Sequence, residues 1–340
     1  MTEPPISDRP HLAEGLTAPK ARDPFHRSSA FASLMLVVLT ALWGLSFSLM
    51  KLWQAAADSG PVPSGAFSAT LVVALSTVLV RTGLALPLLV AVRPDFVTGP
   101  SRRAHLCGVA LGVVFFGAFT CLVTGLNVIS PARSALLINL TCVFVPLMIW
   151  FWLGTPPSRL LVIGIVLCLG GATVLTAGGV GGGAGVSWGD AISVLAAVLF
   201  ALQVVLLDRL GQKERSQHFT LMFLGTTAFG SALVLLLALG GEITAWVGWL
   251  SEMFSRPNMV PIVIGMSVTT ALSLSLMSTY QPRVGANRAA LIYLLEIVFS
   301  AAFGIAFGFD ELTWLLILSG TLIIAGNLVV ELPGLRRKPK

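Results

Sequence analysis

Two ionisable residues lie inside long apolar stretches of this sequence. Glu296 lies about ten residues into one stretch, and Arg81 lies near the middle of another. A charge in hydrocarbon costs about 3 kcal/mol or more unless it faces a partner or a watery cavity. Glu296 could carry a proton or bind a substrate amine, or it could be held by a neighbouring helix. Arg81 could bind an anionic substrate group, although an ion pair with Glu296 or bonds to backbone carbonyls are the favoured interpretation.

Other polar and aromatic side chains in apolar stretches extend this set. We expect a shared cavity near the middle of the membrane, formed by side chains from four stretches and open to a small-molecule substrate. The predicted substrate-binding residues are Trp43, Ser46, Asn139, Gln203, Tyr293 and Glu296. For each of them, bonding or packing between helices is the alternative. Arg133 and Arg288 begin two similar stretches, which suggests a role in gating or packing at opposite membrane faces.

The residue types that catalysis or metal binding would require are poorly placed. The histidines are His11, His26, His105 and His218, and they fall in the N-terminal segment or at the edges of apolar stretches. Cys107, Cys121, Cys142 and Cys168 lie in apolar stretches without CxxC spacing, as small buried apolar residues do. We therefore expect no catalytic residues, no metal site and no cofactor.

Composition places the chain in lipid. Of its 340 residues, 56% are hydrophobic and 11% are charged, and the mean hydropathy is +0.90. A soluble domain has about 25% charged residues, so a water-soluble enzyme is excluded. The net charge of +6 does not indicate nucleic-acid binding, because most Lys and Arg residues fall in loops and terminal segments.

The sequence predicts an all-α integral membrane protein with ten transmembrane helices. A membrane helix needs about 20 mostly apolar residues, and ten such stretches are present. Their approximate spans are 30–53, 67–92, 104–128, 133–153, 159–177, 188–208, 219–240, 258–280, 287–307 and 312–331. They are too continuous for the alternating strands of a β-barrel.

The ten stretches divide into two similar halves. Arg133 and Arg288 each open an Arg-x-Ala-Leu segment, and Gly164 and Gly170 match Gly320 and Gly326 at nearly the same separation. Five spans is an odd number, so the second half must be inverted relative to the first, as in many secondary transporters. We assign a disordered cytoplasmic tail to 1–28, one five-helix repeat to 29–180, a second to 187–332 and a basic cytoplasmic tail to 333–340.

The distribution of basic residues predicts the orientation. With both termini in the cytoplasm, only Lys51, Arg133 and Arg256 lie on the outer side, which agrees with the excess of Lys and Arg in cytoplasmic loops. The predicted location is the cell inner membrane. We also expect Trp53, Trp150, Trp152, Trp188 and Trp314, near the ends of spans, to lie at the membrane interface.

Several short motifs resemble those of the drug/metabolite transporter superfamily, in its ten-helix EamA branch. They are Leu42-Trp43-Gly44-Leu45-Ser46-Phe47 with Lys51, Trp188-Gly189-Asp190, Arg288-Ala-Ala-Leu-Ile with Leu295-Glu296, and Gly308-Phe-Asp-Glu311-Leu-Thr. The resemblance covers roughly residues 30–331. It implies a transporter, and members include exporters of amino acids and related metabolites.

The expected function is therefore secondary transport of a small metabolite, such as amino acid export, by alternating access and with possible proton coupling. A membrane channel is the alternative, followed by a membrane-embedded enzyme. The sequence leaves the substrate, the direction, the coupling ion and the oligomeric state open, with a monomer as the working expectation.

Overall fold

The computed structural model describes residues 29–57, 62–63, 69–92, 101–126, 137–177, 187–211, 217–308 and 313–336, and its regular elements in these ranges are all helices. In chain order they are α1 (Ser29–Ala57), α2 (Ala69–Val92), α3 (Arg102–Leu126), α5 (Thr141–Leu153), α6 (Arg159–Ala177), α7 (Trp188–Gly211), α8 (Gln217–Leu239), α9 (Ile243–Ser255), α10 (Met259–Val284), α11 (Ala286–Tyr293), α12 (Leu295–Ala306) and α13 (Trp314–Arg336). The predicted boundaries at 28, 180 and 187 fall in or beside segments outside these ranges, and α13 continues past residue 332.

Seven helical segments of the described chain are long and apolar enough to cross a membrane. They are Ala30–Ala57, Ala69–Ala91, Arg102–Gly125, Trp188–Leu210, Thr220–Leu239, Met259–Val284 and Ala286–Ala306. Three shorter apolar helices, Leu137–Trp152, Arg159–Gly171 and Ile317–Gly326, fall on the remaining predicted stretches. The all-α membrane class is confirmed, and the number of ten spans stays a prediction.

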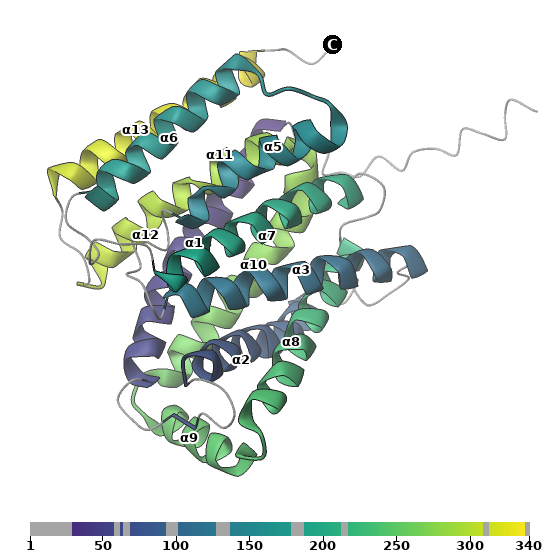
Figure 1. Ribbon diagram of the computed structural model, residues 1–340, viewed down its shortest axis with the longest axis vertical. Coiled ribbons are helices and arrows are strands. Elements are labelled where there is room, and N and C mark those ends of the chain that lie inside the picture. Colours follow the sequence, from purple (N-terminus) through teal and green to yellow (C-terminus); the bar gives the residue numbers. More distant parts are fainter. Residues whose placement is uncertain are drawn as a thin grey trace, which may run out of the picture.

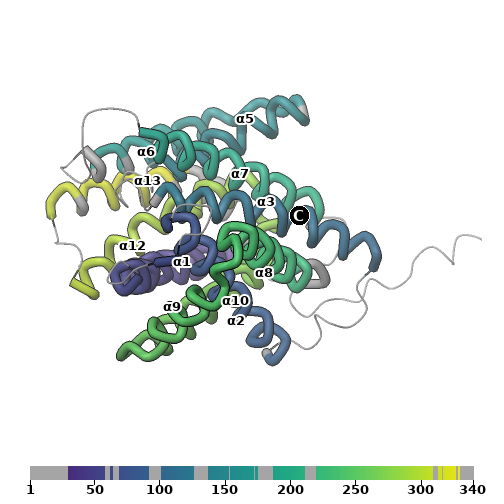
Figure 2. The backbone as a smooth tube through the Cα atoms, turned by 60° about the horizontal axis from the view of Figure 1, so that its bottom comes forward, coloured from purple at the N-terminus to yellow at the C-terminus, as the bar shows by residue number. Residues whose placement is uncertain are grey.

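Most helices pack into one bundle, and two further helices form a pair along one side of it (Figure 1). In the bundle, α1 packs against α10 and α12, α3 lies against both α7 and α8, and α2 contacts α8 and α10. The pair is α6 and α13, which lie side by side along their length in both views (Figure 2). The bundle is the part that surrounds the cavity described below.

Two of the apolar segments are interrupted by a tight turn. In one, Leu140 separates residues 137–139 from α5, and in the other, Leu294 separates α11 from α12. At both breaks the backbone forms hydrogen bonds between residues three apart, as in a 3₁₀ turn. At the first, Leu140 N donates to Leu137 O at 3.2 Å and Val143 N donates to Leu140 O at 2.9 Å. At the second, Leu294 N donates to Leu291 O at 3.1 Å and Ile297 N donates to Leu294 O at 3.2 Å. A break of this kind is tolerated inside a membrane only where protein or a water-filled cavity surrounds it.

Helix α9 is an element that the sequence reading missed. It lies in the polar interval between predicted spans seven and eight, and 13 residues with Glu242 and Glu252 beside and within it do not make a span. One face is buried: Trp246 Nε1 donates to Ser76 Oγ at 2.8 Å, and Trp249 meets Trp53 edge to face at 6.4 Å. Trp53 is therefore fully buried between helices, whereas Trp150, Trp152, Trp188 and Trp314 are exposed, and their place at the membrane interface stays a prediction.

Glycines set the spacing of two helix pairs. A Cβ on Gly44 of α1 would lie 2.7 Å from Cβ of Phe299 in α12, and one on Gly326 of α13 would lie 2.6 Å from Sγ of Cys168 in α6. Small residues let helix backbones approach closely, which matters where lipid removes the hydrophobic drive for association. In α6, Gly171 rather than Gly170 faces α13.

The neighbouring glycines of α6 give a matched test of this packing. A Cβ on Gly171 would lie 2.8 Å from the Ser319 carbonyl oxygen, whereas a Cβ on Gly170 would meet nothing within 4 Å. We expect Gly171→Ala to cost about 1–3 kcal/mol from overpacking and to lower the thermal midpoint of the detergent-purified protein. Gly170→Ala makes the same change in helix propensity without a clash, so it should not lower the thermal midpoint. Equal midpoints for the two variants would contradict the assignment of the α6–α13 contact.

Candidate functional site

A cavity of about 390 Å³ lies in the centre of the helix bundle. Its wall is built from α1, α2, α3, α7, α10, α11 and α12 and from residues around the break at Leu140. The lining follows α12 as far as Gly304 and reaches Thr313 and Leu315 at the start of α13. The cavity therefore extends from the middle of the bundle toward the end where α12 and α13 are connected.

The structure brings all six predicted substrate-binding residues to this cavity. Trp43, Ser46, Asn139, Gln203, Tyr293 and Glu296 line it, and Arg81 lines it with them. Ser46 Oγ is buried and has no hydrogen-bond partner among the described residues. Gln203 is also buried, and its Nε2 lies 3.7 Å from Sδ of Met277, a weak acceptor. These two side chains retain hydrogen-bonding capacity toward a cavity occupant.

A chain of polar contacts ties three helices together beside the cavity. The Tyr293 hydroxyl donates to Oε1 of Gln281 at 2.8 Å, and Nε2 of Gln281 donates to the Val204 carbonyl at 2.7 Å. The Tyr293 ring also meets the Trp43 ring at 5.0 Å between centroids. Because Gln281 is fully buried, both ends of its amide are satisfied inside the protein. The polar contacts link α7, α10 and α11, and the ring contact of Trp43 adds α1.

Arg81 is buried against neutral groups. Its side chain is 5% exposed, Nε donates to Thr270 Oγ1 at 2.5 Å, and Nη1 lies 3.4 Å from Sδ of Met50. The guanidinium carbon also lies 4.7 Å from the centre of the Phe119 ring, within cation–π range. The side chain is therefore held by α1, α3 and α10 from its position on α2.

Arg81 and Glu296 form no direct salt bridge in the described chain, but their opposite charges attract one another. Within the described residues, the hydrogen bonds of Arg81 go to Thr270 and Met50, and Glu296 takes part in no ion pair. The two groups lie on different helices and line the same cavity, so they act on one another through it. Lys51 of α1 is half-buried and also lines the cavity.

The two predicted gating arginines are placed differently. Arg133 lies outside the described residues. Arg288 is half-buried on α11, one turn before Tyr293, and it is not part of the cavity wall. The structure thus places Arg288 on the same helix as Tyr293 but outside the cavity wall.

Several cavity residues were not predicted from the sequence. Thr270, Ser273 and Met277 of α10 line the cavity, and Gln281 follows them on the same helix. The sequence did carry a signal for this helix, because hydroxyl residues are dense between 267 and 279. Such residues bond to nearby backbone carbonyls in a membrane helix, as Thr270 does to Met266 O at 2.6 Å.

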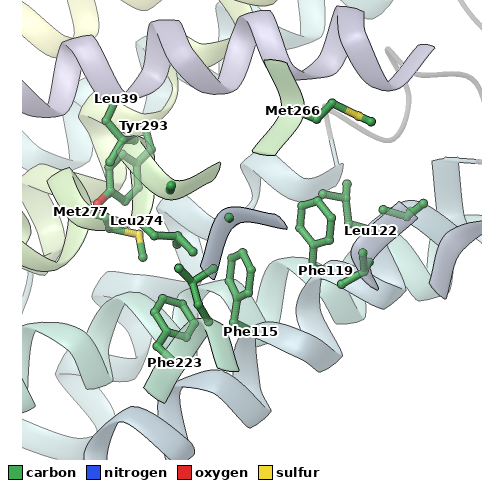
Figure 3. Packing of buried hydrophobic residues seen from close by; sticks show 14 of the residues in the cluster. Leu39, Phe115, Phe119, Leu122, Phe223, Met266, Leu274, Met277 and Tyr293 are labelled. Atoms are coloured by element: carbon green, nitrogen blue, oxygen red, sulfur yellow. The ribbon is translucent and has the colours of Figure 1, made fainter. Parts of the chain in front are cut away.

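The remaining wall is aromatic and apolar. Phe115 and Phe119 of α3 stack at 5.5 Å, and Phe200 of α7 meets Phe115 edge to face at 6.1 Å. Figure 3 shows Phe115 and Phe119 on α3 with Met277 and Leu274 across from them, and Tyr293 beside Met277. The cavity thus has a broad apolar surface and a few fixed polar groups, the usual make-up of a small-molecule site.

Cysteine accessibility tests whether these side chains face water. In a background with the four native cysteines replaced, Ser46→Cys and Ser273→Cys should react with a membrane-impermeant, water-soluble thiol reagent. Val166→Cys, on the exposed apolar surface of α6, is the control and should react slowly because lipid surrounds it. Equal labelling of all three, measured by mass shift, would show that the cavity is not the aqueous part of the protein.

Comparisons with known proteins agree with this architecture. Residues 30–177 match the EamA-like transporter family. A relative in Bacillus subtilis (strain 168), described as the uncharacterized transporter YvbV, is 25% identical over 297 residues, which cover 87% of this chain and 90% of that protein. A solved crystal structure described only as "Crystal structure of protein" superimposes with a TM-score of 0.67 at 19% identity, covering 91% of this chain and 99% of that one.

The solved structure shows a shared fold. The matching family and the relative are both described as transporters. Together with the apolar helices of the described chain, they show a multi-pass membrane protein whose cavity is lined from several helices. Residues 30–177 are therefore similar to the EamA-like transporter family, and most of the chain is similar to a relative described as an uncharacterized transporter.

Proposed function

We propose that this protein is a secondary transporter that exports a small metabolite, such as an amino acid or a related compound, across the inner membrane by alternating access. The central cavity is the observation that carries the proposal. Its volume of about 390 Å³ suits a small solute, and its wall combines aromatic surface with the polar groups of Ser46, Gln203 and Glu296.

The packing of the helices supports two inverted repeats. If α1, α2, α3, α5 and α6 correspond in order to α7, α8, α10, α11–α12 and α13, the most extensive helix contacts have counterparts. The pair α1–α10 corresponds to α7–α3, the pair α2–α10 to α8–α3, and the contact of α1 with α11 and α12 to that of α7 with α5. The pairs α2–α8 and α6–α13 map onto themselves, as a two-fold relation requires.

The helix breaks obey the same relation. Leu140 and Leu294 lie within one residue of corresponding positions in the two halves, with the same pattern of short backbone hydrogen bonds around each. Both breaks adjoin cavity-lining residues, Asn139 on one side and Tyr293 on the other. Discontinuous helices that meet at a central site are typical of transporters with inverted repeats.

Alternating access requires that one end of the cavity close while the other opens. The polar chain of Tyr293, Gln281 and the Val204 carbonyl joins α11, α10 and α7 beside the cavity, and the lining continues to the start of α13 at the opposite end. In the proposed cycle these contacts hold one end closed and separate when it opens. The arrangement of Lys and Arg favours cytoplasmic termini and the inner membrane for this cycle.

Counterflow in proteoliposomes tests whether the protein is a carrier. Vesicles preloaded with unlabelled solute should accumulate external labelled solute transiently and with saturation, because a carrier exchanges one molecule per cycle. A channel would only equilibrate the label, so non-saturable entry without accumulation would contradict the carrier. Solutes for the assay can be chosen by comparing the medium of overexpressing and deletion cells.

Glu296 is the proposed site of proton coupling. It lies in the first turn of α12, lines the cavity and forms no ion pair in the described part of the chain. Glu296→Gln should fold and express normally, because Gln avoids the cost of a buried charge, and should lose proton-driven transport by about 100-fold, within the range for a removed proton-transfer group. Exchange at zero pH gradient should persist.

The matched control for this variant is Glu252→Gln. Glu252 lies on α9, with an exposed side chain that pairs with Arg256 at 2.9 Å, so this change removes an acid outside the cavity. It should leave the response to a pH gradient unchanged. Transport by Glu296→Gln at the wild-type rate across pH would show that this residue does not couple protons to transport.

A further inference from the structure

Helix α9 connects two apolar helices at one end of the bundle. Its neighbours α8 and α10 contain the segments Thr220–Leu239 and Met259–Val284, each long and apolar enough to cross a membrane. The 13 residues of α9 extend over about 20 Å, which is less than the hydrocarbon thickness of about 30 Å. In Figure 1, α9 lies at the bottom end of the bundle, where α8 ends. The chain therefore leaves one apolar segment, forms α9 and enters the next at the same membrane surface.

The backbone turns at both ends of α9. Gly240 and Gly241 precede the helix with φ values of 57° and 110°, and Asn258 follows it with a φ of 68°. Residues in this left-handed region end a helix and change the direction of the chain. Helix α9 is therefore a separate element, not a continuation of α8 or α10.

One face of α9 packs against the bundle. Trp246, Trp249 and Met253 follow the three- and four-residue spacing of a single helix face, and the last two are buried. Just past the helix, the Arg256 guanidinium donates a hydrogen bond to the Ala56 carbonyl near the end of α1. These contacts fix the rotation of α9 about its own axis, and so they determine which residues face outward.

The rest of α9 divides into an apolar face and a polar face. The apolar face consists of Ile243, Val247, Leu250 and Phe254. Ile243 is 43% and Val247 51% exposed, and the other two side chains are half-buried. The polar face consists of Thr244, Gly248, Ser251 and Ser255, all exposed. Because each polar position follows an apolar one by a single residue, the two faces differ by about 100° around the helix axis.

The apolar face of α9 continues the outer surface of the neighbouring helices. Leu236 and Leu237 of α8 are exposed shortly before α9, and Val260 and Ile264 of α10 are exposed shortly after it. Exposed apolar side chains on membrane-crossing helices face lipid, and apolar groups are stabilised when they leave water. The same environment is therefore available to the apolar face of α9.

We propose that α9 binds the lipid surface, lying in the plane of the membrane with its apolar face at the boundary between headgroups and acyl chains. Amphipathic helices in this position bury their apolar face about 5–10 Å deep and keep their polar face in water. Glu252 agrees with this placement, because it is exposed and lies nearly opposite Ile243 and Phe254 around the helix. Lipid is favoured over a second copy of the chain because lipid-facing side chains adjoin both ends of α9. The assignment does not depend on transport.

Spin-label accessibility tests the proposal with the full-length protein in liposomes of phosphatidylethanolamine and phosphatidylglycerol. In a background with the four native cysteines replaced, nitroxides at Ile243→Cys and Val247→Cys should collide with oxygen, be shielded from a water-soluble nickel complex and lie about 5–10 Å deep. Thr244→Cys and Ser251→Cys, on the polar face of the same helix, are the matched controls and should be open to the nickel complex. Val166→Cys, exposed on the apolar surface of α6, should give a deeper position in lipid.

Three results would overturn the proposal. Access of the nickel complex to both faces would show that α9 is surrounded by water. Shielding of the apolar face from both oxygen and nickel would show that a second copy or another protein covers it. Preference for oxygen on both faces would show that α9 is immersed in hydrocarbon rather than lying at the surface. Two labelled positions on each face keep the test valid if one variant does not fold, and no solute is needed, so a failure of the transport proposal leaves the result unchanged.

Discussion

The constraint on which this structure depends is that polar groups in lipid must find their partners inside the protein. Backbone groups meet it by forming helices, which is why regular structure in the described chain is helical. Side chains meet it mostly locally, as the Thr270 hydroxyl does by bonding to Met266 O. Where a helix is interrupted, at the turns of Leu140 and Leu294, and where a charge is buried, at the guanidinium of Arg81, the groups gather around one cavity. The candidate functional site therefore lies where polar groups are least completely satisfied by other groups of the protein.

Close packing brings the helices to the distances at which those partners can meet. Lipid tails are as apolar as leucine, so association in the membrane depends on contact area and on small residues rather than on escape from water. Gly44 lets α1 approach α12 near Phe299, which sets Trp43 against Tyr293 at 5.0 Å between ring centroids. Gly326 brings α13 against Cys168 of α6, outside the cavity-bearing bundle. The first contact shapes the site, and the second holds the outer pair together.

The sequence predicts the class of fold and most of the cavity because both follow from where polar residues interrupt apolar stretches. Ser46, Gln203 and Glu296 stand out in this way, and the structure places each at the cavity wall. Helix α9 was missed because its 13 residues are amphipathic and fall below the length of a span. Gln281 was missed because it lies at the end of a span, where an amide is unremarkable until Tyr293 and Val204 are seen to bond it. The partners of Arg81 lie on α1, α3 and α10, and the pattern of residues within α2 does not show which helices pack against it.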